Sequence, residues 1–296
     1  MMIRFFLLLA LIWPGALAAS EVRFQLEGYE RRFQVFAPDD PQGEMPLVLV
    51  LHGVFQTDAR MIDTTRGRWE EFAKANNFVA VFPNAVNMVW DIGQGAGTFE
   101  PMPRRDDIAY LDQVIALTSE RYQIDRNRVF MVGFSLGAQM SFAYTCQRGG
   151  IRGIATVSMP LPKALLDDCA RTPAVPLLSI HGTNDPVIPA EGGDLPMEGD
   201  TVLSLISQQE TIDIFAGKAG CTGPGELKSY DRRDDATKAN FNRWSGCSVP
   251  IWTMSIEGLG HKWPGGGPDL PVAVLGRGTE EVEGTAFVWS FFSALK

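Results

Sequence analysis

The sequence predicts an α/β fold with a mainly parallel central sheet and helices on both faces of that sheet. Segments 47–51, 79–82 and 128–132 are short continuous apolar runs, the pattern of strands that are buried on both sides. Segments with a helical spacing of apolar residues separate them, and such alternation is typical of parallel strands joined by crossover helices. A hydrophobic content of 45% is sufficient for the core that this fold requires.

The first elements are predicted from local patterns. Residues 21–37 form an antiparallel hairpin, because apolar and polar residues alternate on either side of Gly28. The strand at 47–51 follows. A helix is expected over 69–76, where apolar residues recur at helical spacing, and the strand at 79–82 comes directly after it.

A longer helix is predicted over 108–118, preceded by Asp106 and Asp107, whose negative charges suit the positive end of a helix. Helix capping is therefore a better interpretation of these two aspartates than an acid/base pair. The remaining predicted elements are, in chain order, a strand at 128–132, a helix at 136–147, strands at 154–158, 177–181 and 251–256, and a final helix at 279–294.

Residues 186–245 interrupt this alternation of strands and helices. They are rich in Gly, Asp and other polar residues and contain one amphipathic piece around 201–215. We interpret them as a polar insertion over the edge of the sheet, in the position of a cap. Since no repeat or linker divides the chain, residues 20–296 are predicted to form one catalytic domain that carries this insertion.

Residues 1–19 have the layout of a secretory signal peptide. Arg4 gives a positive start, residues 5–13 are apolar, and Ala16-Leu17-Ala18 supplies small residues for cleavage. An uncleaved anchor is the alternative, which the short apolar run disfavours. The protein is therefore expected to be secreted or periplasmic, and no later segment predicts membrane insertion.

Charge and cysteine content narrow the possible partners. Without the leader the chain has 25 basic and 35 acidic residues, which argues against nucleic acid and anionic lipid as partners. Its four cysteines, Cys146, Cys169, Cys221 and Cys247, can form disulfides in an exported protein, and three pairings are possible. No cysteine or histidine cluster suggests a metal, and no cofactor is expected.

A serine motif stands between a predicted buried strand and a predicted helix. Gly133-Phe134-Ser135-Leu136-Gly137 fits the tight strand-to-helix turn that exposes a nucleophilic hydroxyl above the sheet, with glycines leaving room for the turn. This turn is typical of the α/β-hydrolase fold. We therefore predict Ser135 as the nucleophile.

A serine hydroxyl needs a base in contact with it, and the chain has three histidines. His261 lies in a Gly-flanked loop just after the strand at 251–256, and Asp185 lies just after the strand at 177–181. The chain order serine, aspartate, histidine is that of α/β-hydrolases. The alternative, that Asp185 only caps a turn and His261 packs in the core, does not explain why all three elements occur in this order.

The turn after the first buried strand should help to bind a negatively charged oxygen. A backbone N–H from Val54 or Phe55 is predicted as one donor, and the N–H of Leu136 as the other. His52 and His181, each at the end of a strand, are interpreted as structural residues.

The motifs together resemble the secreted esterases grouped with polyhydroxybutyrate depolymerases, feruloyl esterases and acetylxylan esterases. The resemblance covers nearly the whole chain after the leader. Its motifs are LVLVLHG at 47–53, FPNA at 82–85, GFSLGAQMS at 133–141, HGTND at 181–185 and GLGHKWPGG at 258–266. The last of these is the most specific.

The resemblance implies Ser135, Asp185 and His261 as a catalytic triad, and it implies pairing of Cys146 with Cys169 and of Cys221 with Cys247. The family often has His-Gly-Cys-x-Gln or a Gly-rich turn where this chain has His52-Gly53-Val54-Phe55-Gln56, and it commonly has a second glycine where this chain has Ala138 after the serine motif. These positions line the site, so the departures affect the choice of substrate.

Trp263, Trp90 and Gln56 are the predicted substrate-binding residues. Trp244 is a further possible platform for an aromatic or sugar group, and core packing is the alternative for each tryptophan. Phe55, Trp90 and Trp263 could together form an aromatic wall.

The predicted function is hydrolysis of short hydroxyacyl, acetyl or feruloyl esters through an acyl-enzyme. No polymer-binding domain follows the catalytic domain in this sequence, so small and oligomeric esters are the expected substrates. A serine peptidase on the same fold and a non-enzymatic secreted binding protein are the alternatives.

Overall fold

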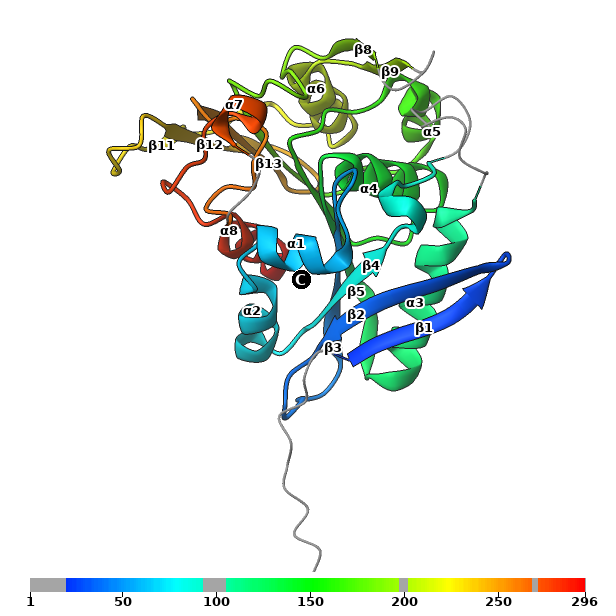
Figure 1. Cartoon of the computed structure of the whole chain (residues 1–296). Coiled ribbons are helices and arrows are strands. Elements are labelled where there is room, and N and C mark those ends of the chain that lie inside the picture. Colours follow the sequence, from blue (N-terminus) through cyan, green and yellow to red (C-terminus); the bar gives the residue numbers. More distant parts are fainter. Residues whose placement is uncertain (1–19, 93–104, 197–201, 268–270, 296) are drawn as a thin grey trace, which may run out of the picture.

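The computed structural model describes residues 20–92, 105–196, 202–267 and 271–295 (Figure 1). Within them a twisted central sheet is covered by helices on both faces, which confirms the predicted fold class. The strands of this sheet are β1 (Ser20–Leu26), β2 (Tyr29–Phe36), β3 (Met45–Leu51), β4 (Val79–Asn84), β5 (Ile124–Phe134), β6 (Gly153–Val157), β7 (Leu177–Gly182), β10 (Gly223–Pro224), β11 (Lys228–Tyr230), β12 (Lys238–Ser245) and β13 (Ile251–Glu257).

The strands follow the order β1-β2-β4-β3-β5-β6-β7-β13-β12-β10, and β11 pairs with β12. The centre, from β4 to β13, is parallel, whereas the strands on both flanks are antiparallel. Every residue of β3 is buried, because strands flank it on both sides and helices cover both faces. The carboxyl ends of the parallel strands meet at one edge, where such sheets bind ligands.

Two layers of helices cover the sheet. The helices are α1 (Asp58–Thr64), α2 (Arg68–Asn76), α3 (Asp107–Arg121), α4 (Leu136–Gln147), α5 (Leu166–Arg171), α6 (Gln208–Lys218), α7 (Val272–Leu275) and α8 (Gly284–Ser293), with short 3-10 turns η1 (Val86–Met88) and η2 (Lys163–Leu165). Helices α3, α4 and α6 contribute to one apolar core, and α1, α2 and α8 to the other. Figure 1 shows α2 and α8 on one side of the sheet and α3 and α4 on the other.

The ends of the helices follow from their capping groups. Asp106 caps α3 by accepting a hydrogen bond from the Ala109 N–H, as the sequence predicted. Asp107 instead lies in the core, where Arg31 donates to it at 2.5 Å. The last helix begins at Gly284 rather than at 279, because the Glu283 carboxylate accepts from the first N–H groups of α8.

The polar insertion is more closely integrated with the sheet than the sequence indicated. A small antiparallel pair, β8 (Gly193–Pro196) and β9 (Val202–Leu205), precedes α6, and α6 lies over one face of the sheet. The insertion then returns as β12, which pairs with β13 over six residues and extends the main sheet. The prediction that the whole insertion lies over the sheet edge is therefore wrong for β12.

Two disulfides join Cys146 to Cys169 and Cys221 to Cys247. This is the pairing that the family resemblance implied. The first links α4 to α5, and the second closes the part of the insertion between α6 and β13.

The predicted signal peptide, residues 1–19, lies outside the described residues. Within the described ranges no helix has the length and hydrophobicity needed to cross a bilayer.

Candidate active site

Ser135 stands on a very tight turn between β5 and α4. Its backbone has φ 54° and ψ −124°, a conformation that non-glycine residues rarely adopt. Glycines make the turn possible, because a Cβ atom on Gly133 would lie 2.2 Å from the Ala138 nitrogen. A Cβ atom on Gly137 would lie 2.2 Å from the Leu51 carbonyl oxygen. The predicted strand–turn–helix geometry of the serine motif is present in the structure.

The loops after β7 and β13 bring two further side chains to this turn. His261 Nε2 lies 2.9 Å from Ser135 Oγ, and His261 Nδ1 lies 2.7 Å from Asp185 Oδ2. The other oxygen of Asp185 accepts the N–H groups of Val187 at 2.9 Å and Ile188 at 2.8 Å. The structure therefore connects the three residues that sequence order and spacing had selected.

The three side chains are almost fully buried. Ser135 is 4% exposed, His261 5% and Asp185 6%. The His261 N–H donates to the Leu275 carbonyl at 2.6 Å, which fixes the base loop against α7. With the aspartate on Nδ1, the imidazole has Nε2 free to accept the serine proton, which is the arrangement that activates a hydroxyl for attack on a carbonyl.

Two backbone N–H groups, those of Val54 and Phe55, were predicted as alternative oxyanion donors in the turn after β3, and only that of Val54 remains a candidate. The Phe55 N–H donates to the Met88 carbonyl at 3.0 Å and is not available, so the expectation for Phe55 as a donor is wrong. Among the described residues, no group accepts the N–H of Val54 or of Leu136. These two N–H groups are the candidates for binding an oxyanion next to Ser135.

Gln56 holds this turn in shape. Its side-chain oxygen accepts the Gly53 N–H at 3.0 Å, and its amide nitrogen donates to Thr64 at 3.3 Å. Both ends of the predicted substrate-binding amide are therefore engaged within the protein, and Gln56 is a positioning residue for the turn.

Trp90 and Trp263 do not line the site. Trp90 is fully buried: its indole N–H donates to the His52 carbonyl at 2.8 Å, and its ring lies against the His52 imidazole. Trp263 is 2% exposed and packs in the core beside α8. The prediction that both tryptophans bind substrate is wrong, because both side chains are buried in the core.

His52 and His181 have structural contacts, as predicted. His52 Nδ1 lies 2.7 Å from the Gly53 carbonyl, and its Nε2 accepts the Ala85 N–H at 3.0 Å. Burial lowers the pKa of His52 to about 4, so the ring is neutral near pH 7. Burial also lowers the pKa of His181, whose Nε2 lies 2.9 Å from the Ile188 carbonyl.

Exposed apolar side chains occur on the loops that carry the site. Phe55 is 61% exposed and lies next to the oxyanion turn. Met88, whose backbone carbonyl accepts the Phe55 N–H, is also exposed. Val187 follows Asp185 by two residues, and Val272 and Val274 lie on α7, which contacts the His261 loop. Apart from Phe55, sequence reasoning missed these residues, because single apolar residues in loops and in the four-residue helix α7 form no pattern.

A family model described as phospholipase/carboxylesterase matches residues 31–199 of the chain, which include Ser135 and Asp185. A bifunctional acetylxylan esterase/xylanase of Neocallimastix patriciarum is 31% identical over 79% of the chain, although the chain spans only 31% of that protein. A probable feruloyl esterase C of Aspergillus niger is 25% identical over 80% of the chain and 77% of its own length. The resemblance to acetylxylan and feruloyl esterases is thereby confirmed.

Solved structures agree on the fold. An acetyl xylan esterase from Aspergillus awamori matches 82% of the chain and 94% of its own with a TM-score of 0.57 at 13% identity. An S-formylglutathione hydrolase from Agrobacterium tumefaciens matches 95% and 99% with a TM-score of 0.56 at 12% identity. At such low identity these likenesses show the α/β-hydrolase fold alone.

Proposed function

Because this chain belongs to the phospholipase/carboxylesterase family, we propose that it is a serine carboxylesterase that works through an acyl-enzyme. The observation that carries the proposal is the continuous chain of contacts from Ser135 through His261 to Asp185. The esterase names of the relatives support the same reaction class.

In the proposed first step, Ser135 Oγ attacks the ester carbonyl carbon while His261 Nε2 takes the hydroxyl proton. Asp185 holds the ring orientation and stabilises the imidazolium that forms. The N–H groups of Leu136 and Val54 stabilise the negative oxygen of the tetrahedral intermediate. His261 then returns the proton to the leaving alcohol, and the Ser135 ester remains.

In the second half of the reaction, His261 takes a proton from water, and the resulting hydroxide attacks the Ser135 ester. The acid product leaves and the serine regains its proton, so the enzyme returns to its starting state. No step requires a group beyond the side chains and backbone named here.

We further propose that the substrates carry short or aromatic acyl groups, including acetyl, hydroxyacyl and feruloyl esters of small molecules and oligomers. The support is local. Phe55 is an exposed aromatic ring beside the predicted oxyanion turn, and Val187, Val272 and Val274 add small apolar surfaces on the other loops of the site. Such a surface suits an acyl chain of limited size.

The reaction is tested by replacing the nucleophile. Ser135→Ala should remain folded and lower kcat by roughly 10⁴-fold or more, because the covalent intermediate cannot form. The matched control is Ser141→Ala on the same helix, since Ser141 donates to the Gly137 carbonyl and does not touch His261. Retention of esterase activity by Ser135→Ala, or absence of fluorophosphonate labelling in the parent chain, would reject the mechanism.

Substrate class is tested separately with a panel of esters. We expect higher kcat/KM on p-nitrophenyl acetate, p-nitrophenyl butyrate, methyl ferulate and a hydroxybutyrate oligomer than on p-nitrophenyl palmitate. A preference for palmitate, or activation at an oil interface, would indicate a lipase. Cleavage of peptides in place of esters would favour the peptidase alternative.

We also propose that the protein acts outside the cytoplasm. The two disulfides support this location, because such bonds persist in oxidising compartments. The predicted leader at residues 1–19 points to the same compartment.

A further inference from the structure

The sheet face that lies under α6 is polar. Strand pairing places Asn240, Ser255 and His181 in one row across β12, β13 and β7. The next row consists of Asn242, Thr253 and Ser179. The opposite face of the same strands is apolar and belongs to the core beside α8. A helix that covers a sheet normally packs on apolar side chains. Packing of α6 on the sheet therefore does not explain why this face is polar.

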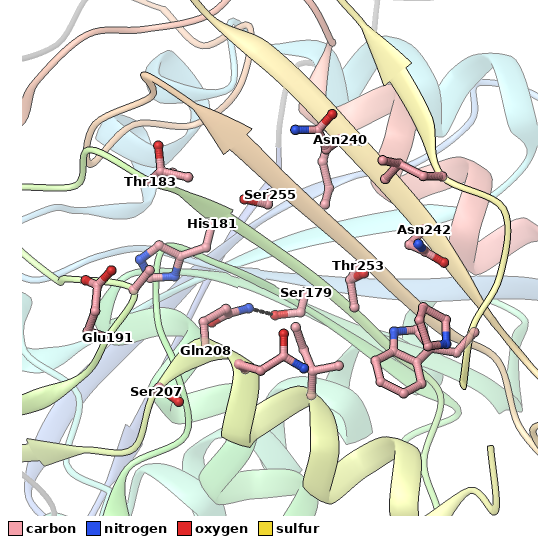
Figure 2. Close-up of a pocket in the computed structure, with 18 residues that line it drawn as sticks. Ser179, His181, Thr183, Glu191, Ser207, Gln208, Asn240, Asn242, Thr253 and Ser255 are labelled. Atoms are coloured by element: carbon pink, nitrogen blue, oxygen red, sulfur yellow. Dashed lines mark hydrogen bonds between the residues drawn. The ribbon is translucent and has the colours of Figure 1, made fainter. Parts of the chain in front are cut away.

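Between the two polar rows and α6 lies a pocket of about 590 Å³, within the size range of small-ligand sites (Figure 2). Figure 2 shows the labelled side chains of the strands facing Gln208 on α6. Exposed side chains of Thr183, Glu191 and Leu227 stand at its rim, so solvent reaches it. Neither Ser135 nor His261 lines the pocket, which is therefore separate from the candidate active site.

One buried atom in the pocket wall, Asn242 Oδ1, is an acceptor that no donor among the described residues reaches. The polar side chains of His181 and Gln208 contact each other, His181 Nε2 lies 2.9 Å from the Ile188 carbonyl, and the Gln208 amide contacts the Ser179 hydroxyl. A buried acceptor without a donor is costly, and a hydroxyl group of a ligand would satisfy it.

The other residues that line the pocket indicate which kind of hydroxylated molecule would fit it. None of the described residues that line the pocket is Lys or Arg, so a carboxylate or phosphate would find no counter-charge. The half-buried Trp244 offers an indole, and Pro224 and Leu227 offer apolar surface. A sugar ring combines hydroxyl groups with an apolar face of C–H bonds, and the pocket has a partner for each.

We propose that this pocket binds a neutral saccharide of one or two rings, at a site distinct from the triad. The inference stands independently of the esterase proposal, because it rests on the two rows of polar side chains, the unpaired oxygen of Asn242 and the lack of Lys and Arg among the described residues that line the pocket. A saccharide held in this pocket would be bound by the same domain that carries the triad, and it would not be cleaved there.

The test is isothermal titration calorimetry of the full chain with xylobiose, cellobiose and maltose. At least one of the three should bind. Trp244→Ala should weaken that binding roughly tenfold or more by removing the stacking surface, and Gln208→Leu should do so by removing a polar group from the pocket wall. Trp244→Phe should restore most of the affinity. Gln25→Leu, at an exposed amide on β1, is the matched control and should bind as the parent does.

The position of the bound sugar is tested by blocking the nucleophile. Protein labelled at Ser135 with a fluorophosphonate should bind the saccharide with unchanged affinity, because the two sites are separate. Two results would overturn the proposal. One is no binding of any of the three sugars. The other is binding that disappears on Ser135 labelling and is unaffected by Trp244→Ala and Gln208→Leu, which would locate the sugar in the active site.

Discussion

The carboxylate of Asp185 joins the catalytic arrangement to the loop that carries it. One oxygen contacts His261, and the other accepts the N–H groups of Val187 and Ile188. Asparagine can keep the loop contacts through its oxygen and then turns an N–H₂ group toward His261. The ring must accept at Nδ1 and carry its proton at Nε2, where it can no longer take the serine proton.

Asp185→Asn should therefore lower kcat by about 10⁴-fold while the protein stays folded. The measurement is steady-state kinetics on p-nitrophenyl acetate together with circular dichroism. Asp168→Asn, which alters an aspartate on α5 away from the triad, is the control and should be close to the parent. Near-parent kcat in Asp185→Asn would show that the aspartate does not set the tautomer.

Buried His52 makes folding stability depend on pH. Its pKa is about 4 in the folded protein and near the ordinary value of 6.5 when unfolded. Above about pH 6.5 the His52 ring is neutral in both the folded and the unfolded protein, and its contribution to the free energy of unfolding is fully present. As the pH falls, the ring takes up a proton first in the unfolded protein, which favours unfolding. The loss ends near pH 4 and amounts to about 3 kcal/mol. Burial of His181 acts in the same direction.

Urea unfolding at about pH 7 and about pH 4.5 should thus give a larger fall in unfolding free energy for the parent chain than for His52→Gln. Glutamine cannot titrate, and all other groups are shared, so the difference isolates His52. An equal fall in both proteins would contradict the expected burial of a neutral ring.

Single residues also show which parts of the site could be predicted from the sequence and which could not. Ser135, His261 and Asp185 were selected by motif, order and adjacent strands, and the structure brings them into contact. Trp263 lies two residues after His261, and Trp90 follows the FPNA motif at 82–85, yet burial depends on which surfaces pack together in three dimensions. The same limit applies to the Phe55 N–H, whose acceptor at Met88 comes from a distant loop.

At the scale of elements, helix α4 approaches β3 without room for a side chain. A methyl group on Gly137 would lie 2.2 Å from the Leu51 carbonyl and 2.6 Å from the His52 carbonyl, and neither backbone can shift freely. Gly137→Ala should therefore destabilise the protein by about 3 kcal/mol or more. Chemical denaturation monitored by tryptophan fluorescence measures the change.

The matched variant is Gly217→Ala on the exposed side of α6, where a methyl group meets nothing within 4 Å. Here alanine should stabilise by up to about 1 kcal/mol, because it favours the helix and restricts the unfolded chain. Similar effects of the two substitutions would argue against close packing of α4 on β3.

The alternating pattern of elements was predictable because buried parallel strands and amphipathic helices have distinct spacings. Strand β12 was not predicted, since its residues alternate between the apolar core and the polar face under α6 within a polar segment. Helix α1 was also missed: it is short, and only Asp58, Met61 and Thr64 on it are buried. Both β12 and α1 are stabilised by packing against residues that are remote in sequence, so local patterns do not predict them.

At the scale of the whole molecule, the disulfides tie local loops to the body of the fold. The Cys221–Cys247 pair is half-buried, whereas Cys146 and Cys169 are buried, so a mild reductant should open Cys221–Cys247 first. Peptide mapping after partial reduction tests this order.

Removing the more accessible bond should also lower stability. A Cys221→Ser, Cys247→Ser double variant should lose about 3 kcal/mol, as expected for a cross-link over 26 residues. Denaturant unfolding of the oxidised parent and the variant measures the loss. An unchanged midpoint would mean that the cross-link does not restrict the unfolded chain.

The polar face under α6 has a consequence for cooperativity. Helix α6 buries little apolar surface, mainly at Ile212, Phe215 and Ala216, so less hydrophobic free energy opposes its separation from the sheet. We therefore expect the segment around α6 to open locally at a lower free energy than the fully buried β3. The Cys221–Cys247 link then limits how far this segment can separate from the sheet that holds the Ser135 turn.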